Sequence, residues 1–251
     1  MSSVLAFALL ILLQTPAAPP PITVSAAISL TDALEAIARA FEASGGGPVR
    51  FNFGSSNALA RQISSGAPVD LYISADEAQM DVVARAGAID PASRVNLLQN
   101  RLAVMTRAGL ASLKDARGLM APAIRRIAIG DPAAVPAGIY ARQFLQAAGV
   151  WDALQPKLVP VGNVRAALTA VETGSVDAAI VYESDAVTAR SATTAFVVAG
   201  PTAPRIVYPA AVVAASRNRA AAERFLSYLR AAPAAAIFRH YKFVPIPPLE
   251  E

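Results

Sequence analysis

Hydroxyl side chains stand at two places where an apolar strand should give way to a helix. Ser29 follows the run ITVSAA at 22–27, and Ser56 follows VRFNFG at 49–54. The first turn of a helix carries backbone N–H groups without partners and about half a positive charge. Hydroxyls and amides gathered at such places can donate hydrogen bonds to an anion, and no Lys or Arg is needed.

Two further junctions extend this pattern. Ala137 lies in VPAGIY and Val164 lies in GNVRAAL, and Arg165 is the one basic residue in the first turn of the four junctions. Small residues there would let a ligand approach the backbone. Ordinary helix capping also favours Ser, Thr, Asp and Asn at helix starts. Capping is therefore the better interpretation of Ser29, Ser56 or Asn163 taken alone, and only the joint pattern indicates an anion site.

The elements that would position these junctions alternate between apolar strands and amphipathic helices. After the first strand, apolar residues recur at helical spacing at Leu34, Ile37, Ala38 and Phe41. Such alternation predicts an α/β fold with mainly parallel sheets flanked by helices. In sheets of this kind, ligands bind beyond the carboxyl ends of the strands, where the four junctions would lie.

The pattern changes at two places where the chain could cross between two lobes, near 101–106 and near 205–213. We therefore predict a discontinuous first lobe made of 22–100 and 207–251, and a second lobe made of 101–206. No linker between them is long enough to indicate independently folding domains.

Composition excludes several classes of function. The chain has 251 residues, 55% of them hydrophobic, so it can bury a full core. Its net charge of +4 comes from scattered Lys and Arg residues and does not predict a nucleic-acid partner. There is no Cys, which excludes a thiolate metal site and a thiol nucleophile, and His240 is the single His. A metal site with several His ligands is therefore excluded.

The first residues resemble an export signal. The apolar run from Val4 to Leu13 is ten residues long, too short for a bilayer, which takes about 20 residues. It is typical of a signal peptide, which we place at 1–20. We expect a soluble periplasmic protein without stable membrane insertion, and without a lipid anchor because no Cys could carry one.

Seven segments carry a resemblance to a known family: AAISLTDAL, FGSSNALARQI, GAPVDLYISAD, IGDPAAVPAGIYA, VRAALTAVE, IVYESDAV and VYPAAVV. Over about 22–243 the chain resembles the periplasmic molybdate-binding proteins, the solute receptors of molybdate ABC importers. The resemblance implies a type II periplasmic binding protein fold, with two α/β lobes, two crossover strands and the ligand in the cleft.

The resemblance also implies a ligand and the residues that hold it. The ligand would be molybdate, with tungstate as a second one, bound as an oxyanion without any direct bond from protein to metal and without a cofactor. Matching motif to motif, the donors would be the Ser29 hydroxyl and amide, the Ser56 hydroxyl, the amides of Ala137 and Val164, and the Tyr182 phenol. The implied partner is the membrane permease of the transporter, and we expect a monomer.

Three alternative interpretations stay open. The same fold could bind sulfate, thiosulfate or a small organic anion. An enzyme is a second class: a serine hydrolase using Ser29 or Ser56, although the sequence has no G-x-S-x-G motif and His240 is remote from both serines. Tyr182 could simply be a packed tyrosine at a strand end.

Two neighbours of the implied donors could disturb the site. A carboxylate of Glu183 facing the cleft would oppose anion binding, so we expect it to point outward. Asn57 stands where a further hydroxyl would suit the Ser-rich turn.

Overall fold

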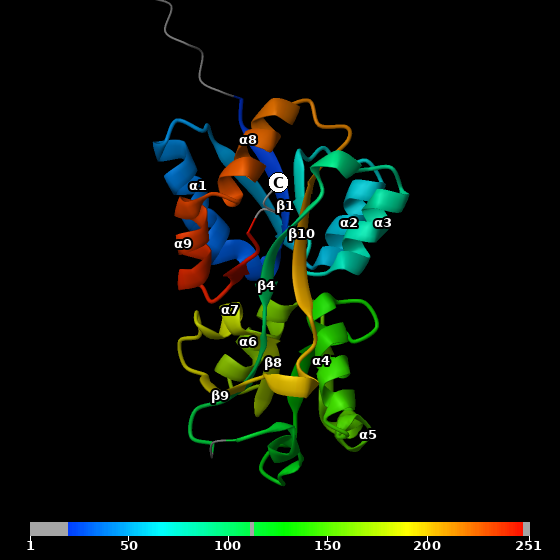
Figure 1. The fold of residues 1–251 in the computed structure, drawn as a ribbon. Coiled ribbons are helices and arrows are strands. Elements are labelled where there is room, and N and C mark those ends of the chain that lie inside the picture. Colours follow the sequence, from blue (N-terminus) through cyan, green and yellow to red (C-terminus); the bar gives the residue numbers. More distant parts are fainter. Residues whose placement is uncertain (1–19, 111–112, 248–251) are drawn as a thin grey trace, which may run out of the picture.

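Two β-sheets with helices on their faces make up the protein, and each sheet forms the centre of one lobe (Figure 1). The computed structural model describes residues 20–110 and 113–247. The predicted two-lobed α/β fold is confirmed. The predicted signal peptide, apart from Pro20, lies outside the described residues.

The first sheet has the strand order β11-β4-β10-β3-β1-β2. Its strands are β1 (Ile22–Ala27), β2 (Val49–Gly54), β3 (Leu71–Ile73), β4 (Val95–Asn100), β10 (Ile206–Val212) and β11 (Val244–Pro245). Strands β2 and β3 run parallel to β1, whereas β10 is antiparallel to both β3 and β4. The sheet is therefore mixed, because the strand that returns from the other lobe enters in the opposite direction.

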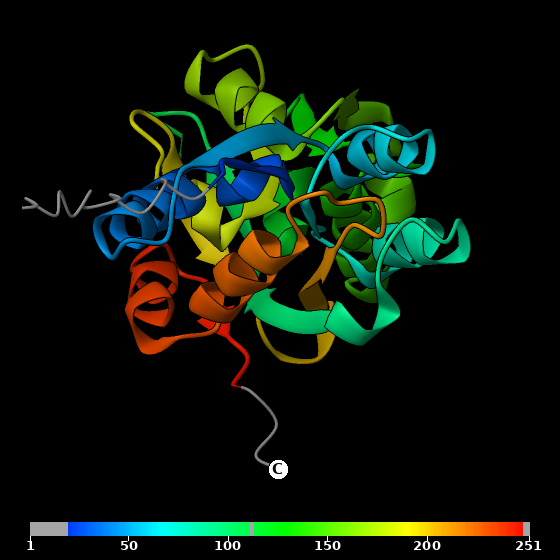
Figure 2. The same ribbon diagram turned by 90° about the horizontal axis from the view of Figure 1, so that it is seen from above.

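Helices cover both faces of this sheet. They are α1 (Thr31–Ala43), α2 (Ser56–Ser64), α3 (Glu77–Arg85), α8 (Arg219–Leu229) and α9 (Ala232–His240). Seen from above, α1, α8 and α9 lie on one side of the sheet, and α2 and α3 lie on the other (Figure 2). The apolar positions of α1 that the spacing predicted are buried, and the Phe41 ring lies 5.0 Å from that of Phe225 on α8.

The second sheet has the strand order β7-β6-β8-β5-β9 and is also mixed. Its strands are β5 (Leu102–Thr106), β6 (Ile127–Gly130), β7 (Leu158–Val161), β8 (Ala178–Tyr182) and β9 (Thr193–Val197). Its helices are α4 (Pro136–Ala147), α5 (Trp151–Leu154), α6 (Val164–Glu172) and α7 (Glu183–Ala186). Short 3-10 helices complete the chain: η1 (Ile28–Leu30), η2 (Pro91–Ser93), η3 (Ala116–Met120), η4 (Gln155–Lys157) and η5 (Gly200–Thr202).

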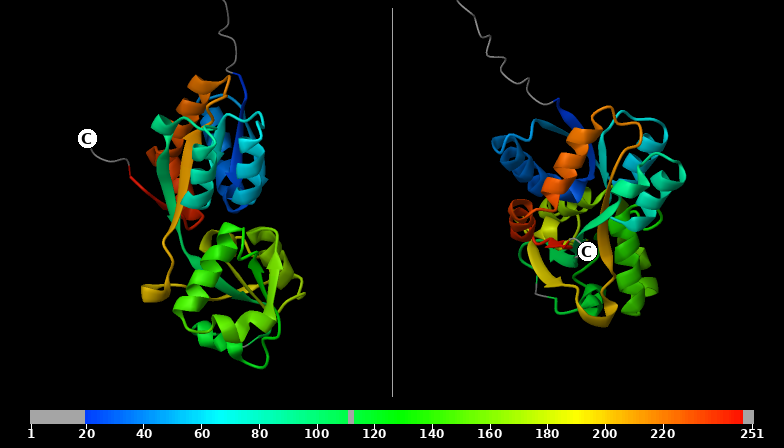
Figure 3. Two further views of the ribbon diagram at one scale, coloured as in Figure 1. Left: turned by 90° about the vertical axis from the view of Figure 1, so that its right-hand side faces the viewer. Right: turned by 45° about the horizontal axis from the view of Figure 1, so that its top comes forward.

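The chain passes between the lobes at two places that lie side by side (Figure 3). Strand β4 continues into β5 of the other sheet with only Arg101 between them, and β10 returns beside β4, where Ile206 is the partner of Asn100. Sheet membership thus changes near both predicted crossovers. The exact division into 22–100 with 207–251, and 101–206, stays a prediction that this arrangement supports.

The register of the parallel strands decides where the helices begin. Ala27 at the end of β1 is the partner of Gly54 at the end of β2. In the second sheet, Gly130 at the end of β6 is the partner of Val161 at the end of β7. Because each pair of strands ends together, the two helix starts that follow it lie at the same edge of their sheet.

Glycine at two positions lets α4 begin very close to β6. A Cβ atom built on Gly138 would lie 2.0 Å from the carbonyl oxygen of Gly130, which is a backbone atom and cannot rotate away. The start of α4 can therefore lie directly against the end of β6, because Gly138 and Gly130 have no side chains to separate them. A side chain here would displace the helix start rather than repack around it.

We predict that Gly138→Ala lowers the free energy of unfolding by about 3 kcal/mol or more. The atoms that the new methyl group would meet belong to the backbone, so a small side-chain movement cannot make room for it. Urea unfolding followed by circular dichroism measures this. Gly162→Ala is the matched control, since nothing lies within 4 Å of a Cβ at Gly162. Equal stability of the two variants would contradict the assigned packing.

Candidate functional site

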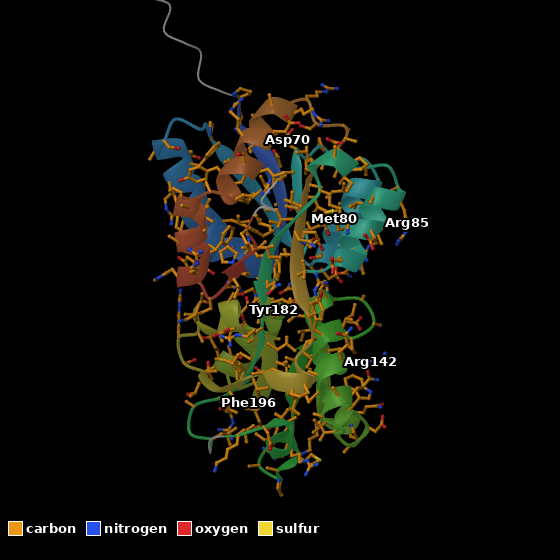
Figure 4. The ribbon with its side chains drawn as sticks, in the orientation of Figure 1. Asp70, Met80, Arg85, Arg142, Tyr182 and Phe196 are labelled. Atoms are coloured by element: carbon orange, nitrogen blue, oxygen red, sulfur yellow. The ribbon has the colours of Figure 1, made fainter. Side chains whose placement is uncertain are left out.

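A pocket lies between the two lobes, where four helix starts converge. It spans about 230 Å³ of space between the lobes, part of which is open to solvent. Its lining is formed by Ala27, Ile28, Ser29, Gly54, Ser55, Ser56, Ala75, Val135, Pro136, Ala137, Asn163, Val164 and Tyr182. The structure thus brings all five residues named as donors, Ser29, Ser56, Ala137, Val164 and Tyr182, to one small pocket, and Tyr182 lies near the middle of the molecule (Figure 4).

The helix starts at the pocket leave their amides free to donate. No side chain caps η1, α2 or α4. Only α6 is capped by a side chain, since Asn163 Oδ1 accepts from the amide of Ala166 at 2.9 Å. Capping therefore explains Asn163 but neither Ser29 nor Ser56. The first amides of each helix, Ala137 and Val164 among them, have no intrahelical acceptor, and both of these residues line the pocket.

Ser56 is held so that its hydroxyl hydrogen can point into the pocket. Its side chain is buried, and Oγ accepts a hydrogen bond from the amide of Ala75 at 2.9 Å. Because that bond uses a lone pair, the hydroxyl hydrogen is left for another acceptor. The Tyr72 hydroxyl donates to the Ser56 carbonyl at 2.9 Å and fixes the backbone behind it. Ser56 therefore offers a hydrogen-bond donor to the pocket.

Two tyrosines stand beside the pocket. Tyr182 is buried, and its Oη has no hydrogen-bond partner among the described residues. Tyr208 on β10 lies with its Oη 3.0 Å from Ser29 Oγ. Burial raises the pKa of both phenols well above the ordinary value, so both keep their hydrogens at neutral pH. A buried hydroxyl without a partner costs about 1–3 kcal/mol, and the Tyr182 hydroxyl, in a residue that lines the pocket, is free to donate to an acceptor there.

The residues that line the pocket include no Lys, Arg, His, Asp or Glu. Arg165, the basic residue next to Val164, is occupied elsewhere: its Nη2 lies 2.5 Å from Asp32 Oδ2 on α1, and its Nε lies 2.7 Å from Asp185 Oδ1 on α7. Burial lowers the pKa of Arg165, but the two carboxylates outweigh this and raise it. The charge of Arg165 is thus balanced outside the pocket, in an ion pair that joins the two lobes.

The two residues that could have disturbed the site do not enter it. Glu183 forms a two-pronged ion pair with Arg101, with N···O distances of 2.8 and 3.1 Å, and does not line the pocket. Asn57 does not line the pocket either, and its Oδ1 is buried without a hydrogen-bond partner among the described residues. The carboxylate of Glu183 is therefore engaged outside the pocket.

The pocket has the chemistry of binding rather than of nucleophilic catalysis. A serine nucleophile needs a base within hydrogen-bond reach of its hydroxyl. Ser29 Oγ contacts a phenol, and Ser56 Oγ contacts a backbone amide. His240 lies at the end of α9 against Tyr241 and does not line the pocket. What the pocket offers is a set of neutral donors around a small space.

Sequence reasoning missed several residues that support the site. Asn100 contacts Tyr208, and Tyr208 contacts the pocket residue Ser29. The partners of Arg165 were not recognised either. Tyr208 lies in the quoted segment VYPAAVV, yet its contact with Ser29 spans 179 residues. No local spacing indicates such a contact.

Comparison with known proteins gives the family. The family model described as bacterial extracellular solute-binding protein matches residues 22–244. The molybdate-binding protein ModA of Escherichia coli is 43% identical over 229 residues, covering 88% of each chain.

The chain belongs to the bacterial extracellular solute-binding protein family, among its ModA-type periplasmic binding proteins. The members of this family bind solutes for transport and are not enzymes, so the serine hydrolase hypothesis is set aside.

Solved structures of solute-binding proteins share the fold. The periplasmic molybdate-binding protein of Azotobacter vinelandii superposes with a TM-score of 0.81 at 26% identity, covering 90% of this chain and 100% of its own. The sulfate-binding protein SubI of Mycobacterium tuberculosis superposes with a TM-score of 0.80 at 22% identity, covering 91% and 88%. Because proteins named for different anions share the fold, the fold alone does not select the ligand.

The buried carboxyl of Asp185 makes the free energy of unfolding of this solute-binding protein depend on pH. Burial raises its pKa to about 6, and Arg165 opposes the rise. In the unfolded chain the carboxyl titrates near its model value of 3.8. Between these values the folded state binds a proton that the unfolded state does not, so Asp185 favours folding more as the pH falls.

We therefore predict that wild type gains about 1 kcal/mol of stability relative to Asp185→Asn when the pH falls from 7 to 5. Urea unfolding of both proteins at the two pH values measures this difference. Asp152→Asn, an exposed substitution, should show no such gain. A stability difference between wild type and Asp185→Asn that stays constant with pH would contradict the raised pKa.

Proposed function

We propose that this protein is an extracytoplasmic receptor that binds molybdate, and also tungstate, in the pocket between its lobes and delivers it to the permease of an ABC importer. The anion would be held by Ser29, Ser56, Ala137, Val164 and Tyr182. It would be bound through its oxygens, with no protein atom on the metal and no cofactor.

The observation that carries this proposal is a small buried pocket lined by neutral donors. A hydrogen bond to a charged acceptor contributes about 1.5–3 kcal/mol. The hydroxyls of Ser56 and Tyr182 and the free amides of several helix starts lie around the same space. Several such bonds together offset a large part of the free energy needed to remove water from a dianion.

The donors also favour a particular class of anion. Molybdate and tungstate carry no hydrogen near neutral pH and only accept hydrogen bonds, whereas phosphate near neutral pH carries one. A pocket that offers donors but no acceptor leaves that hydrogen unpaired. Sulfate is acceptor-only as well, so its rejection has to rest on size, because a smaller tetrahedron cannot reach all donors together. Sulfate, thiosulfate and small organic anions are the alternative ligands.

The arrangement of lobes suits capture and delivery. The donors on η1 and α2 lie in the lobe of the first sheet, and the donors on α4, α6 and β8 lie in the lobe of the second sheet. An anion between them would hold the lobes together, and the strands β4, β5 and β10 that join them would act as the hinge. No helix among residues 20–110 and 113–247 is long and apolar enough to cross a membrane. A periplasmic location and a monomeric state are part of the proposal.

Calorimetric titration of the mature chain with molybdate, tungstate, sulfate and phosphate tests the proposal. We expect tight binding of molybdate and tungstate, with sulfate and phosphate far weaker. Thermal unfolding in the presence of each anion gives a second readout, since a ligand that binds only the folded state raises the melting temperature. Tight binding of sulfate with weak binding of molybdate would assign the protein to the alternative ligand class.

Removing either hydroxyl donor should weaken binding. We predict that Ser29→Ala and Ser56→Ala each lower the affinity for molybdate by about 1.5–3 kcal/mol, the contribution of one hydrogen bond to a charged acceptor. Calorimetry measures the change. Ser64→Ala, at an exposed position of the same helix as Ser56, is the control and should bind like wild type. Wild-type affinity in both pocket variants would show that the donors are misassigned.

Tyr182 should behave differently with and without the anion. Its hydroxyl has no partner among the described residues, so Tyr182→Phe removes an unpaired polar group. We predict that the ligand-free variant is as stable as wild type or more stable, while its molybdate affinity falls by about 1.5–3 kcal/mol. Thermal unfolding and calorimetry on the same samples measure the two effects. Loss of stability without loss of affinity would mean that Tyr182 only packs at the strand end.

A further inference from the structure

A chain of buried side-chain contacts runs from the crossover strands to the pocket. Asn100 at the end of β4 lies with its Nδ2 3.2 Å from Tyr208 Oη on β10. Tyr208 Oη lies in turn 3.0 Å from Ser29 Oγ on η1. All three side chains are buried. The pocket serine is thus linked to both strands that join the lobes.

The orientation of the Asn100 amide is fixed by a group that can only donate. The backbone amide of Arg101 donates to Asn100 Oδ1 at 2.8 Å, which places the oxygen on that side. The nitrogen then faces the two hydroxyls on the other side, Ser184 Oγ at 2.9 Å and Tyr208 Oη. Asn100 therefore donates a hydrogen bond to Tyr208.

This donation sets the direction of the next bond. A phenol has one hydrogen, and among the described residues the hydrogen-bond partners of Tyr208 Oη are Asn100 and Ser29. If Ser29 donated to Tyr208, the phenol hydrogen would be buried without an acceptor, which costs about 1–3 kcal/mol. The favoured order is therefore Asn100 to Tyr208 to Ser29. Ser29 Oγ then accepts from Tyr208, and its own hydrogen is left for the pocket.

We propose that Asn100 and Tyr208 are positioning residues that make Ser29 a hydrogen-bond donor toward the pocket, and that this makes the site select anions without a hydrogen of their own. The inference rests on the proposed function. Neither residue lines the pocket, so neither touches the anion. With one lone pair of Ser29 Oγ engaged by Tyr208 and the serine hydrogen directed at the pocket, Ser29 meets the anion as a donor, and the hydrogen of a protonated oxyanion such as hydrogen phosphate would face that donor.

Tyr208→Phe tests the proposal with the smallest change. The ring keeps its packing against Tyr182 and Phe243, whose centroids lie 5.8 and 5.5 Å away, while the hydroxyl that engages Ser29 is lost. We expect the molybdate affinity to fall about tenfold, as for the loss of one hydrogen bond in a buried network. Phosphate binding at pH 7.5 should not fall in proportion, so the ratio of molybdate to phosphate affinity should decrease.

Asn100→Asp reverses the chain and gives a second, independent test. A carboxylate accepts where the amide donated, so the Tyr208 hydrogen would turn to it, and Tyr208 Oη would then accept from Ser29. The serine hydrogen would be withdrawn from the pocket, and molybdate affinity should fall. The new charge alone also repels the anion, so the variant is compared in the wild-type and Tyr208→Phe backgrounds. If the chain operates, the loss caused by Asn100→Asp should be at least about fivefold smaller without the phenol.

Calorimetry with molybdate and with phosphate on wild type, both single variants and the double variant decides the outcome. Tyr228→Phe, a tyrosine on α8 packed against Phe41, is the control and should keep the wild-type affinity ratio. Circular dichroism melts identify variants that fold. If Tyr208→Phe did not fold, Asn100→Asp with the wild-type phenol would carry the test, because its added charge repels both anions: a lower molybdate-to-phosphate affinity ratio would support the reversed chain, and an unchanged ratio would overturn the proposal.

The results separate this inference from the proposed function. Tight molybdate binding by wild type, with an unchanged molybdate-to-phosphate ratio in Tyr208→Phe, would overturn the positioning role and leave the receptor function standing. An equal fall for both anions would indicate a merely structural tyrosine and would also overturn it. Absence of molybdate binding in wild type would overturn the receptor function and this inference together.

Discussion

The structure depends on free backbone amides being brought together at the ends of parallel strands. β1 and β2 end in register at Ala27 and Gly54, and β6 and β7 end in register at Gly130 and Val161. Two helices therefore begin at the same edge of each sheet, just after the paired strands end. The crossover strands join the two lobes so that these two edges face each other across the pocket. Donors that are fixed before a ligand arrives need no reorganisation when it binds, so in the proposed receptor neutral groups would take the place of formal charges.

Two of the charged groups near the pocket are paired outside it. Arg165 contacts both Asp32 and Asp185, and Glu183 contacts Arg101. The first of these contacts joins α6 of one lobe to α1 of the other, and so it also contributes to holding the lobes in the observed arrangement. In the proposed receptor, a pocket lined by neutral donors would discriminate between anions by hydrogen-bond direction and size.

Much of the fold was predictable because it follows from local patterns. The strands at 22–27 and 49–54 and the apolar face of α1 are encoded by consecutive residues, and the structure has them where the spacing indicates. The five pocket residues could be named because the motifs that carry them match a family pattern. The Asn100, Tyr208 and Ser29 chain could not be predicted, since its contacts join residues 108 and 179 positions apart. The contact of Arg165 with Asp32 was missed for the same reason, because Asp32 lies 133 positions away.

The most direct test of the central claim is a crystal structure of the protein with molybdate bound. We expect the anion in the pocket between the lobes, with its oxygens within hydrogen-bond distance of the hydroxyls of Ser29, Ser56 and Tyr182 and of the amides of Ala137 and Val164. We also expect Arg165 still to be paired with Asp32 and Asp185. An anion bound elsewhere, or one held in the pocket by an Arg or Lys side chain, would contradict the claim that neutral donors are sufficient.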